Sequence, residues 1–259
     1  MIQTQSRPLR LSGPQLGIWF AQQLDPKNPI YNTAEYVEIN GPIDVKCFER
    51  ALNQAVKETK ALYVQFGEGQ NGPWQELRPF SKISLPFIDV SDYENPLQAA
   101  KSWMQEDVSQ PIDLKREQLF RSALFKIAEH QYIWYQCIHH IAIDGFGFSL
   151  FMQRAAERYT QIVRRLPYDQ DSFPSFSAVL EEDQAYRASE KMQKDRQYWL
   201  ERFADQPDLV NLADKFARPA HDVIRENASL AKDSAQSLKR SSIFQGNWSE
   251  VLIAATARS

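Results

Sequence analysis

Two adjacent histidines followed by an Asp-Gly pair form the segment of this sequence whose residue types could do chemistry. The segment comprises His139, His140, Asp144 and Gly145, with three apolar residues between the second histidine and the aspartate. An imidazole gains or loses a proton near neutral pH, and a short carboxylate in a turn accepts backbone N–H groups or binds a cation. Glycine permits a positive φ or a close approach of the backbone. The segment therefore places a titratable group at a turn, where reacting groups are often found.

The elements on either side of the motif predict how it is held. Residues 131–140 form an alternating, aromatic-rich run that predicts a buried strand, and the amphipathic stretch from about residue 146 predicts a helix. Successive strand side chains point to opposite faces, so both histidines can serve one site only if the strand ends between them. Otherwise one is structural and the other faces a cleft. The face of His139 would include Ile133, Tyr135 and Cys137, and that of His140 would include Trp134, Gln136 and Ile138.

Hydrophobic periodicity predicts the remaining elements. Helices are predicted over residues 13–24, 44–58, 96–108 and 147–166, with a long charged helix over about 176–203. Strands are predicted over residues 31–39 and 119–128, with a hairpin from 61–66 and 74–77. A strand over 223–230 and a helix over 248–258 follow, too little to bury a core of their own. The helix after the motif is expected to turn these residues inward: Phe148, Phe151, Ala155, Ile162 and Leu166.

Composition limits the class of protein. The chain has 259 residues, of which 43% are hydrophobic, enough for a large core and two lobes. Its net charge of -3 and pI of about 5.9 argue against a nucleic-acid-binding protein. The two cysteines, Cys47 and Cys137, lie in apolar settings and are expected to be buried free thiols. With no apolar run near the roughly 18 residues of a membrane span, we expect a soluble, cytoplasmic protein.

Simpler interpretations of the motif are a core histidine pair, a metal site or the neighbour of a serine nucleophile. A metal site needs three or four convergent ligands, but the four histidines lack supporting cysteines or carboxylates at ligand spacing. Ser149 lies inside the predicted helix without the G-x-S-x-G context of a nucleophile. The Asp-Gly pair and the strand–turn–helix context favour a functional histidine over a core pair. Because the sequence lacks the further ligands that a metal site needs, we expect no bound metal.

The motif at residues 139–145 resembles the HHxxxDG signature of condensation domains of nonribosomal peptide synthetases, which related acyltransferases of the chloramphenicol-acetyltransferase type share. Residues 11–19 resemble the first condensation motif, S-x-A-Q-x-R-L-W, and residues 176–183 lie where the family has its fourth. Residues 134–136, 144–146 and 248–257 look like the first condensation domain of enterobactin- and bacillibactin-type siderophore synthetases, which attach an aryl acid. The resemblance implies an α/β fold like chloramphenicol acetyltransferase, a two-layer sandwich with a mixed, largely antiparallel sheet and packed helices.

The sequence departs from the family at its second motif, R-H-E-x-L-R-T-x-F. This motif falls on residues 58–66, where Tyr63 replaces the arginine that can pair with the motif aspartate. The partner of Asp144 is therefore open among Arg121, Arg154 and the Tyr63 hydroxyl. We predict that Asp144 is mostly buried and holds the geometry of the turn.

The resemblance implies amide bond formation between an acyl thioester, expected to be aryl, and an aminoacyl thioester. Phosphopantetheine arms of a donor and an acceptor carrier protein would bring the substrates, with no cofactor bound directly. His140 would accept the proton of the attacking amine or orient that amine. Gly145 would offer its backbone N–H to the oxyanion, and His139 and Asp144 would be structural.

The resemblance also predicts a domain organisation. Residues 1–173 would be the N-terminal lobe, residues 174–204 a connecting helix, and residues 205–259 the beginning of an incomplete C-terminal lobe. Because the family places its site in a tunnel between two lobes, we expect residues 1–259 alone to be inactive and to need the rest of the synthetase. Two other functions stay open: a catalytically inactive module that docks a carrier protein, and a CoA-dependent acyltransferase of the same fold.

Overall fold

The computed structural model describes residues 8–168, 175–207 and 231–240, together with residues 220, 229, 249, 250 and 253. The chain divides into two compact units, residues 1–222 and 223–259. The second unit contains α7 (Lys232–Arg240). The predicted strand over 223–230 and helix over 248–258 lie, apart from single residues, outside the described residues. No helix of the described residues is long and apolar enough to cross a membrane.

The main sheet of the first unit has four strands in the order β2-β7-β6-β5. They are β2 (Asn32–Asn40), β7 (Gln131–His139), β6 (Phe120–Ala128) and β5 (Phe87–Asp89). The strand β7 pairs antiparallel with β2 and β6, so it is central as predicted, while β5 runs parallel to β6. The sheet is therefore mixed and largely antiparallel, and the α/β class expected from the sequence is confirmed.

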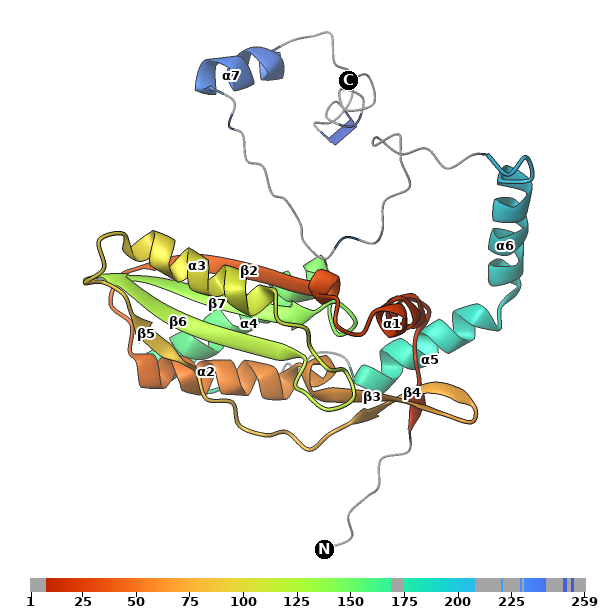
Figure 1. The fold of residues 1–259 in the computed structure, drawn as a ribbon, viewed down its shortest axis with the longest axis horizontal. Helices are drawn as coiled ribbons and strands as arrows, with labels where there is room; N and C mark the ends of the chain where they lie inside the picture. The colour runs from red at the N-terminus through yellow and green to blue at the C-terminus, as the bar shows by residue number, and fades with distance from the viewer. Residues whose placement is uncertain are drawn as a thin grey trace, which may run out of the picture. The chain divides into compact units, whose positions relative to one another are not determined.

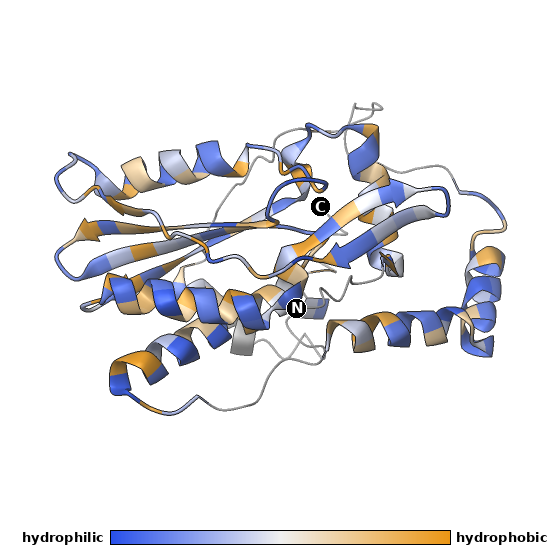
Figure 2. Cartoon of the chain, turned by 90° about the horizontal axis from the view of Figure 1, so that it is seen from below, coloured by the Kyte–Doolittle hydropathy of each residue, from blue (hydrophilic) through white to orange (hydrophobic). Residues whose placement is uncertain are grey.

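Helices cover both faces of this sheet (Figure 1). The helices α2 (Val45–Glu58) and α4 (Gly145–Arg164) pack on one face, as predicted, against Phe120, Leu124, Trp134 and Ile138. The helix α3 (Pro96–Val108) packs on the other face, against Ala123, Phe125, Ile133, Tyr135 and Cys137. Figure 2 shows hydrophobic and hydrophilic residues alternating along the elements, as amphipathic strands and helices require. Because β7 is covered on both sides, Ile133 to His139 are all buried.

Side-chain caps set where the described α-helices of the first unit begin, and three of them illustrate the arrangement. Asp44 accepts from the Cys47 backbone N–H at 2.9 Å and starts α2. Ser12 and Gln15 form a reciprocal capping box at the start of α1 (Gly13–Leu24). Asp144 caps α4 in the same manner as Asp44 caps α2. These bonds satisfy N–H groups that the first turn of a helix leaves without partners.

The described residues of the first unit also form a second sheet and two later helices. The sheet has the order β1-β4-β3, with β1 (Leu9–Arg10), β4 (Gly72–Leu77) and β3 (Val64–Gly69), where β3 and β4 form the predicted hairpin. Short 3₁₀ helices, η1 (Pro29–Tyr31) and η2 (Lys60–Tyr63), precede β2 and β3. The expected continuous helix over 176–203 is instead two helices, α5 (Phe176–Arg187) and α6 (Glu190–Arg202), because Ser189 caps a new helix. Leu166 lies two residues beyond the end of α4 and is 51% exposed, so its expected inward position is wrong.

Candidate functional site

The strand β7 ends between the two histidines of the motif. His139 is its last residue, and His140 follows in a turn that leads to Asp144 and α4. His139 is 1% exposed, whereas His140 is exposed. The strand-alternation argument therefore holds up to His139, on the face of Ile133 and Cys137. The two side chains lie in different environments, one buried and one open to solvent.

Both ring nitrogens of His139 have a hydrogen-bond partner. The backbone N–H of Ile141 donates to Nδ1 at 3.2 Å, so Nδ1 is unprotonated, and Nε2 lies 3.1 Å from Oε1 of Gln22. An amide oxygen only accepts, so Nε2 carries the proton and donates it. Burial, with a smaller contribution from the nearby charge of His140, lowers the pKa of His139 to about 4. A neutral ring with both nitrogens engaged holds structure and has no lone pair left for proton transfer.

His140 has the opposite arrangement. Its Nδ1 lies 2.9 Å from the carbonyl oxygen of Ile143, which can only accept, so Nδ1 carries the proton of the neutral ring. The remaining nitrogen, Nε2, is then an unprotonated acceptor, and it has no partner among the described residues. The backbone N–H of His140 donates to the carbonyl of Tyr31 at 2.8 Å. Local contacts thus fix one ring nitrogen and leave the other, a base, on an exposed side chain.

Asp144 is exposed, so the prediction that it is mostly buried is wrong. Its Oδ1 accepts from the backbone N–H of Gly147 at 2.8 Å, which makes it the N-cap of α4. A cap sits at the end of a helix facing solvent, and its carboxylate needs only one side turned to the backbone. The carboxylate has the predicted backbone partner, and it holds the turn that carries Ile143.

The three cationic or hydroxyl partners considered for Asp144 are engaged elsewhere. Arg121 pairs with Asp107 at 3.1 Å, and the Tyr63 hydroxyl donates to the carbonyl of Lys57 at 2.9 Å. Arg154 lies 3.8 Å from a carboxylate oxygen of Glu58 and 3.7 Å from one of Glu157. Among the described residues the partner of the Asp144 side chain is therefore the backbone of its own helix.

Gly145 is the first residue of α4, and it needs neither of the two properties expected of a glycine there. Its φ is not positive, and no atom lies within 4 Å of the position that a Cβ would take. The close approach occurs two residues later, where a Cβ on Gly147 would lie 2.7 Å from Cγ1 of Ile143. The exposed backbone of Gly145 borders open space, and the compact packing of the turn depends on Gly147.

The other nucleophile candidates are in settings that do not favour reaction. The Ser149 hydroxyl donates to the carbonyl of Gly145 at 3.1 Å, within its own helix. Both cysteines are free, but Cys137 is buried, and burial raises the pKa of its thiol to about 11. Cys47 is half-buried, less than expected. In the part of the chain that the structure describes, no group of three or more histidine, cysteine or acidic residues is arranged to hold a metal.

A cleft of about 450 Å³ lies beside the end of α1. Its wall is formed by the end of α1 and the turn after it, facing the loop from Pro111 to Glu117. Gln22 lines the cleft and also contacts His139. One side chain therefore connects this cleft with the strand end that precedes His140.

Sequence reasoning missed the groups that orient the histidines. They are the side chain of Gln22 and the backbone carbonyls of Tyr31 and Ile143. The carbonyls belong to residues of any type and leave no signal in a sequence. Gln22 does leave one, because it lies three residues after the buried Trp19 on the inner side of α1, where a polar residue is unusual.

Comparisons with known proteins agree on one family. The family model of the condensation domain matches residues 5–251 of the sequence. The chain is similar to the dimodular nonribosomal peptide synthase of Bacillus subtilis (strain 168), with 48% identity over 258 residues, which cover 99% of this chain and 11% of the synthase. It is 42% identical to isonitrile lipopeptide synthase of Streptomyces coeruleorubidus, over 98% of this chain and 17% of that protein. Enterobactin synthase component F of Escherichia coli (strain K12) is 31% identical, over 80% of this chain and 16% of the length of that protein.

Solved structures of condensation domains have the same fold. A variant of the starter condensation domain of rhizomide synthetase, in complex with C8-CoA, matches with a TM-score of 0.77 and 37% identity, over 81% of this chain and 48% of that chain. The first condensation domain of the calcium-dependent antibiotic synthetase, in complex with a substrate analogue, matches with a TM-score of 0.75 and 34% identity. The match covers 80% of this chain and 50% of that chain. The matched stretch is thus about half of each solved chain.

Proposed function

Because the chain belongs to the condensation-domain family of nonribosomal peptide synthetases, we propose that it supplies the catalytic histidine for amide bond formation between two thioesters. One is an acyl thioester on a donor carrier protein, and the other is an aminoacyl thioester on an acceptor carrier protein. The observation that carries the proposal is the environment of His140. Its Nδ1 lies 2.9 Å from the Ile143 carbonyl oxygen, so in the neutral tautomer that donates this bond Nε2 is an acceptor on an exposed ring.

The proposed reaction forms a C–N bond and breaks a C–S bond. The amine nitrogen attacks the thioester carbonyl, and the carbonyl oxygen takes negative charge until the C–S electron pair leaves with sulfur. Nε2 of His140 accepts the proton that the amine gives up, and that proton then neutralises the departing thiolate. The same nitrogen orients the amine through a hydrogen bond before attack. The phosphopantetheine arms carry both substrates, so the proposal needs no cofactor bound to the chain.

The other motif residues have supporting roles in this proposal. The N–H of Gly145, at the positive end of α4, donates to the oxyanion in this proposal. Asp144 caps α4 and sets the turn, and His139 holds the strand end with both ring nitrogens engaged.

We propose an aryl acid as the donor acyl group, in the assembly of a siderophore. Similarity to enterobactin synthase component F of Escherichia coli, and to vanchrobactin synthetase of Vibrio anguillarum at 28% identity, supports this choice. A fatty acyl donor is the second candidate. It is favoured by the 42% identity to an isonitrile lipopeptide synthase and by the likeness to a starter condensation domain solved with C8-CoA. The latter also makes an acyl-CoA the natural probe for a CoA-dependent acyltransferase.

The partners in this proposal are two carrier proteins and the other half of a condensation domain. The solved relatives are about twice as long as the stretch they share with this chain, which covers 48% and 50% of them. Holding two thioesters in line requires both arms to be constrained. We therefore propose that residues 1–259 alone form no amide above background, and that they act when joined to a second half.

The test replaces the matching stretch of the Bacillus subtilis synthase's condensation domain with residues 5–251 of this chain. The folded hybrid is mixed with a loaded acceptor carrier and with one of three donors: an aryl-loaded carrier, an octanoyl-loaded carrier or octanoyl-CoA. Mass spectrometry then detects the amide product. Product with the aryl carrier, and none from residues 1–259 alone, is the expected result. A folded hybrid that makes no amide from any donor would overturn the proposed function in favour of a docking module. Preference for octanoyl-CoA over both carriers would replace it with a CoA-dependent acyltransferase.

A further inference from the structure

We propose that Gln22 is a positioning residue for the amide-forming site, acting through His139 on the loop that carries His140. The inference rests on the proposed function for its catalytic consequence. It concerns a side chain on α1, 117 positions away from His139 in the sequence, that lies outside the histidine motif. Gln22 is 4% exposed, so its amide must find its partners inside the protein.

The hydrogen bonds of the Gln22 amide fix which way it faces. Its Nε2 donates to the carbonyl of Asp25 at 3.0 Å and to the carbonyl of Asn28 at 3.1 Å. Both hydrogens of the amide are then used, and a flipped amide would place oxygen against two carbonyls. Oε1 must therefore point to His139, where it accepts from Nε2 at 3.1 Å.

The turn that holds Gln22 is itself held by a side chain. Asn28 is 5% exposed, and its Oδ1 accepts from the backbone N–H of Ile30 at 3.0 Å. Its Nδ2 donates to the carbonyl of Ala220 at 3.1 Å. The end of α1 and the turn after it thus form a fixed platform for the Gln22 amide.

The His139 ring passes this constraint to the loop. With Nε2 donating to Gln22, the ring has Nδ1 unprotonated and facing the backbone N–H of Ile141 at 3.2 Å. Ile141 is the residue directly after His140. The lowered pKa of His139, about 4 because of burial, keeps the ring neutral and this pattern intact at neutral pH. A ring that lost its Gln22 contact would be free to rotate and release the Ile141 N–H.

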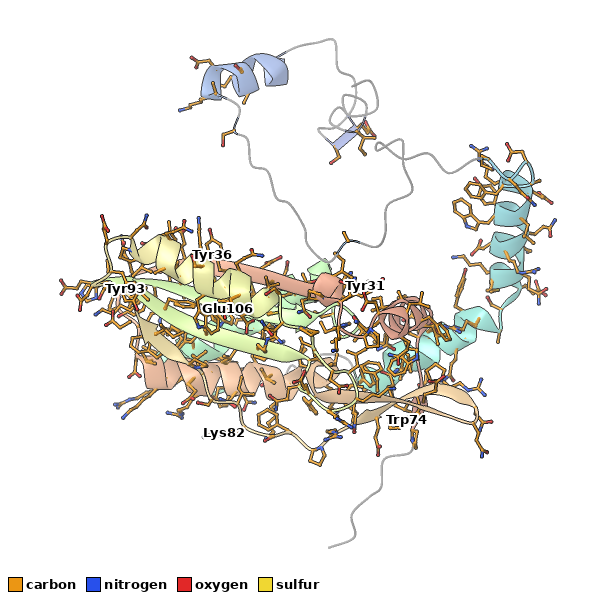
Figure 3. The ribbon with its side chains drawn as sticks, viewed as in Figure 1. Tyr31, Tyr36, Trp74, Lys82, Tyr93 and Glu106 are labelled. Atoms are coloured by element: carbon orange, nitrogen blue, oxygen red, sulfur yellow. The ribbon has the colours of Figure 1, made fainter. Side chains whose placement is uncertain are left out.

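The same part of the chain holds the loop at a second point. Tyr31, labelled in Figure 3 near the start of β2, accepts from the backbone N–H of His140 at 2.8 Å. Gln15, also on α1, reaches the carbonyl of Ile141 with its Nε2 at 3.4 Å. The backbone on both sides of the His140 side chain is therefore tied to α1 or to the turn after it. These hydrogen bonds position the backbone that carries the His140 ring, in addition to the contact of the ring with the Ile143 carbonyl. Gln22 supports the one that passes through the side chain of His139.

The test compares Gln22→Met with Gln23→Met. Methionine is similar in length to glutamine but neither donates nor accepts strongly. Gln23 lines the same cleft, and the side-chain partner of the His139 ring is Gln22 and not Gln23. In the 259-residue chain, ¹H–¹⁵N spectra report the His139 Nε2–H proton, and hydrogen exchange reports the Ile141 amide. We expect Gln22→Met to lose the protected Nε2–H signal and to exchange the Ile141 amide at least tenfold faster, while Gln23→Met leaves both unchanged. Unchanged spectra and exchange in a folded Gln22→Met protein would overturn the proposal.

Kinetics in the hybrid synthase test the catalytic consequence. We expect Gln22→Met to lower kcat by roughly tenfold to a hundredfold with the KM for both carriers unchanged, because misplacing a reacting group by about 1 Å has effects of this size. A fall in kcat that Gln23→Met reproduces would contradict a positioning role. If the unmodified hybrid is inactive, the proposed function fails, and the spectra still decide whether Gln22 orders the loop.

Discussion

The guanidinium group of Arg158 on α4 binds both carboxylate oxygens of Glu58 on α2, deep between the two helices that cover one face of the sheet. Nε lies 3.0 Å from Oε1, and Nη2 lies 3.0 Å from Oε2. The Arg158 side chain is 2% exposed and that of Glu58 is 13% exposed. Such a bidentate pair fixes how α4 lies on α2, and α4 begins at the motif that carries the proposed site.

The first prediction concerns this ion pair. Arg158→Met should lower the free energy of unfolding by about 3 kcal/mol or more, because it leaves the largely buried carboxylate of Glu58 without its main partner. Replacing both residues by methionine should cost less than the sum of the two single replacements, since neither charge then remains buried. Urea unfolding of the four proteins measures the coupling. Strictly additive losses would show that the pair does not act as a unit.

Local patterns predicted the strands and helices whose type and buried face follow from the spacing of apolar residues along the sequence. The alternation through residues 131–140 indicated a buried strand, and β7 is that strand, ending one residue earlier at His139. Apolar residues three and four positions apart in the predicted helix 44–58 indicate an inward face, and of these Phe48, Leu52 and Val56 are buried in α2, whereas Val45 is half-buried. The separation of His139 from His140 has a different cause, because β7 ends between them and His140 lies in the turn that follows.

The rest depended on contacts that no local pattern encodes. The burial of Asp144 was wrongly predicted because a cap and a buried ion-pair partner are both aspartates before a helix, and only the structure separates them. The break at Ser189 interrupts a run of good helix formers, since serine also serves as an N-cap there. Gln22 meets His139 only after α1 has packed beside the end of β7.

The second prediction concerns the cap of α4. Asp144→Ala should lower the free energy of unfolding by about 1 kcal/mol, the usual cost of removing an N-cap acceptor. Asp144→Ser keeps an acceptor and should recover most of that loss. Asp44→Ala, at the equivalent position of α2, is the matched control and should cost a similar amount. If Asp144→Ala alone lowered the free energy of unfolding by several kcal/mol, Asp144 would have to pair with a buried charge. That result would contradict its role as an exposed cap.

The third prediction uses the two glycines at the start of α4. Gly147→Ala should destabilise the protein by about 1–3 kcal/mol, because its Cβ would lie 2.7 Å from Cγ1 of Ile143. Gly145→Ala meets open space and should be neutral or slightly stabilising, since alanine favours helices over glycine. Thermal unfolding of both variants gives the comparison. Equal melting temperatures would show that the turn can yield to the added methyl group.

The fourth prediction concerns the pH dependence of stability. His139 has a pKa of about 4 in the folded state because of burial, against an ordinary value of 6.5. Above pH 6.5 the His139 ring is neutral in both the folded and the unfolded chain. Between pH 6.5 and 4 this ring binds a proton in the unfolded chain but not in the folded chain. This contribution to stability is therefore complete above pH 6.5 and is lost as the pH falls toward 4. The loss should amount to about 3 kcal/mol, at about 1.4 kcal/mol for each tenfold change in proton affinity.

His139→Gln tests this prediction, because glutamine does not titrate. The variant should be less stable at neutral pH, and its free energy of unfolding should fall less steeply between pH 6.5 and 4 than that of the unmodified chain. Urea unfolding at half-unit pH steps provides both curves. Parallel curves would mean that the His139 ring is not held neutral.

The central claim is that Nε2 of His140 serves as the base or orienting group for the attacking amine, and single-turnover kinetics of the hybrid synthase test it most directly. His140→Ala should lower the rate of amide formation by a factor of order 10²–10⁴, the range expected for loss of general acid–base help. The melting temperature should stay within 1 or 2 °C of the unmodified protein, roughly the effect of a surface substitution, because His140 is exposed. A folded His140→Ala hybrid that forms the amide at an undiminished rate would contradict the account.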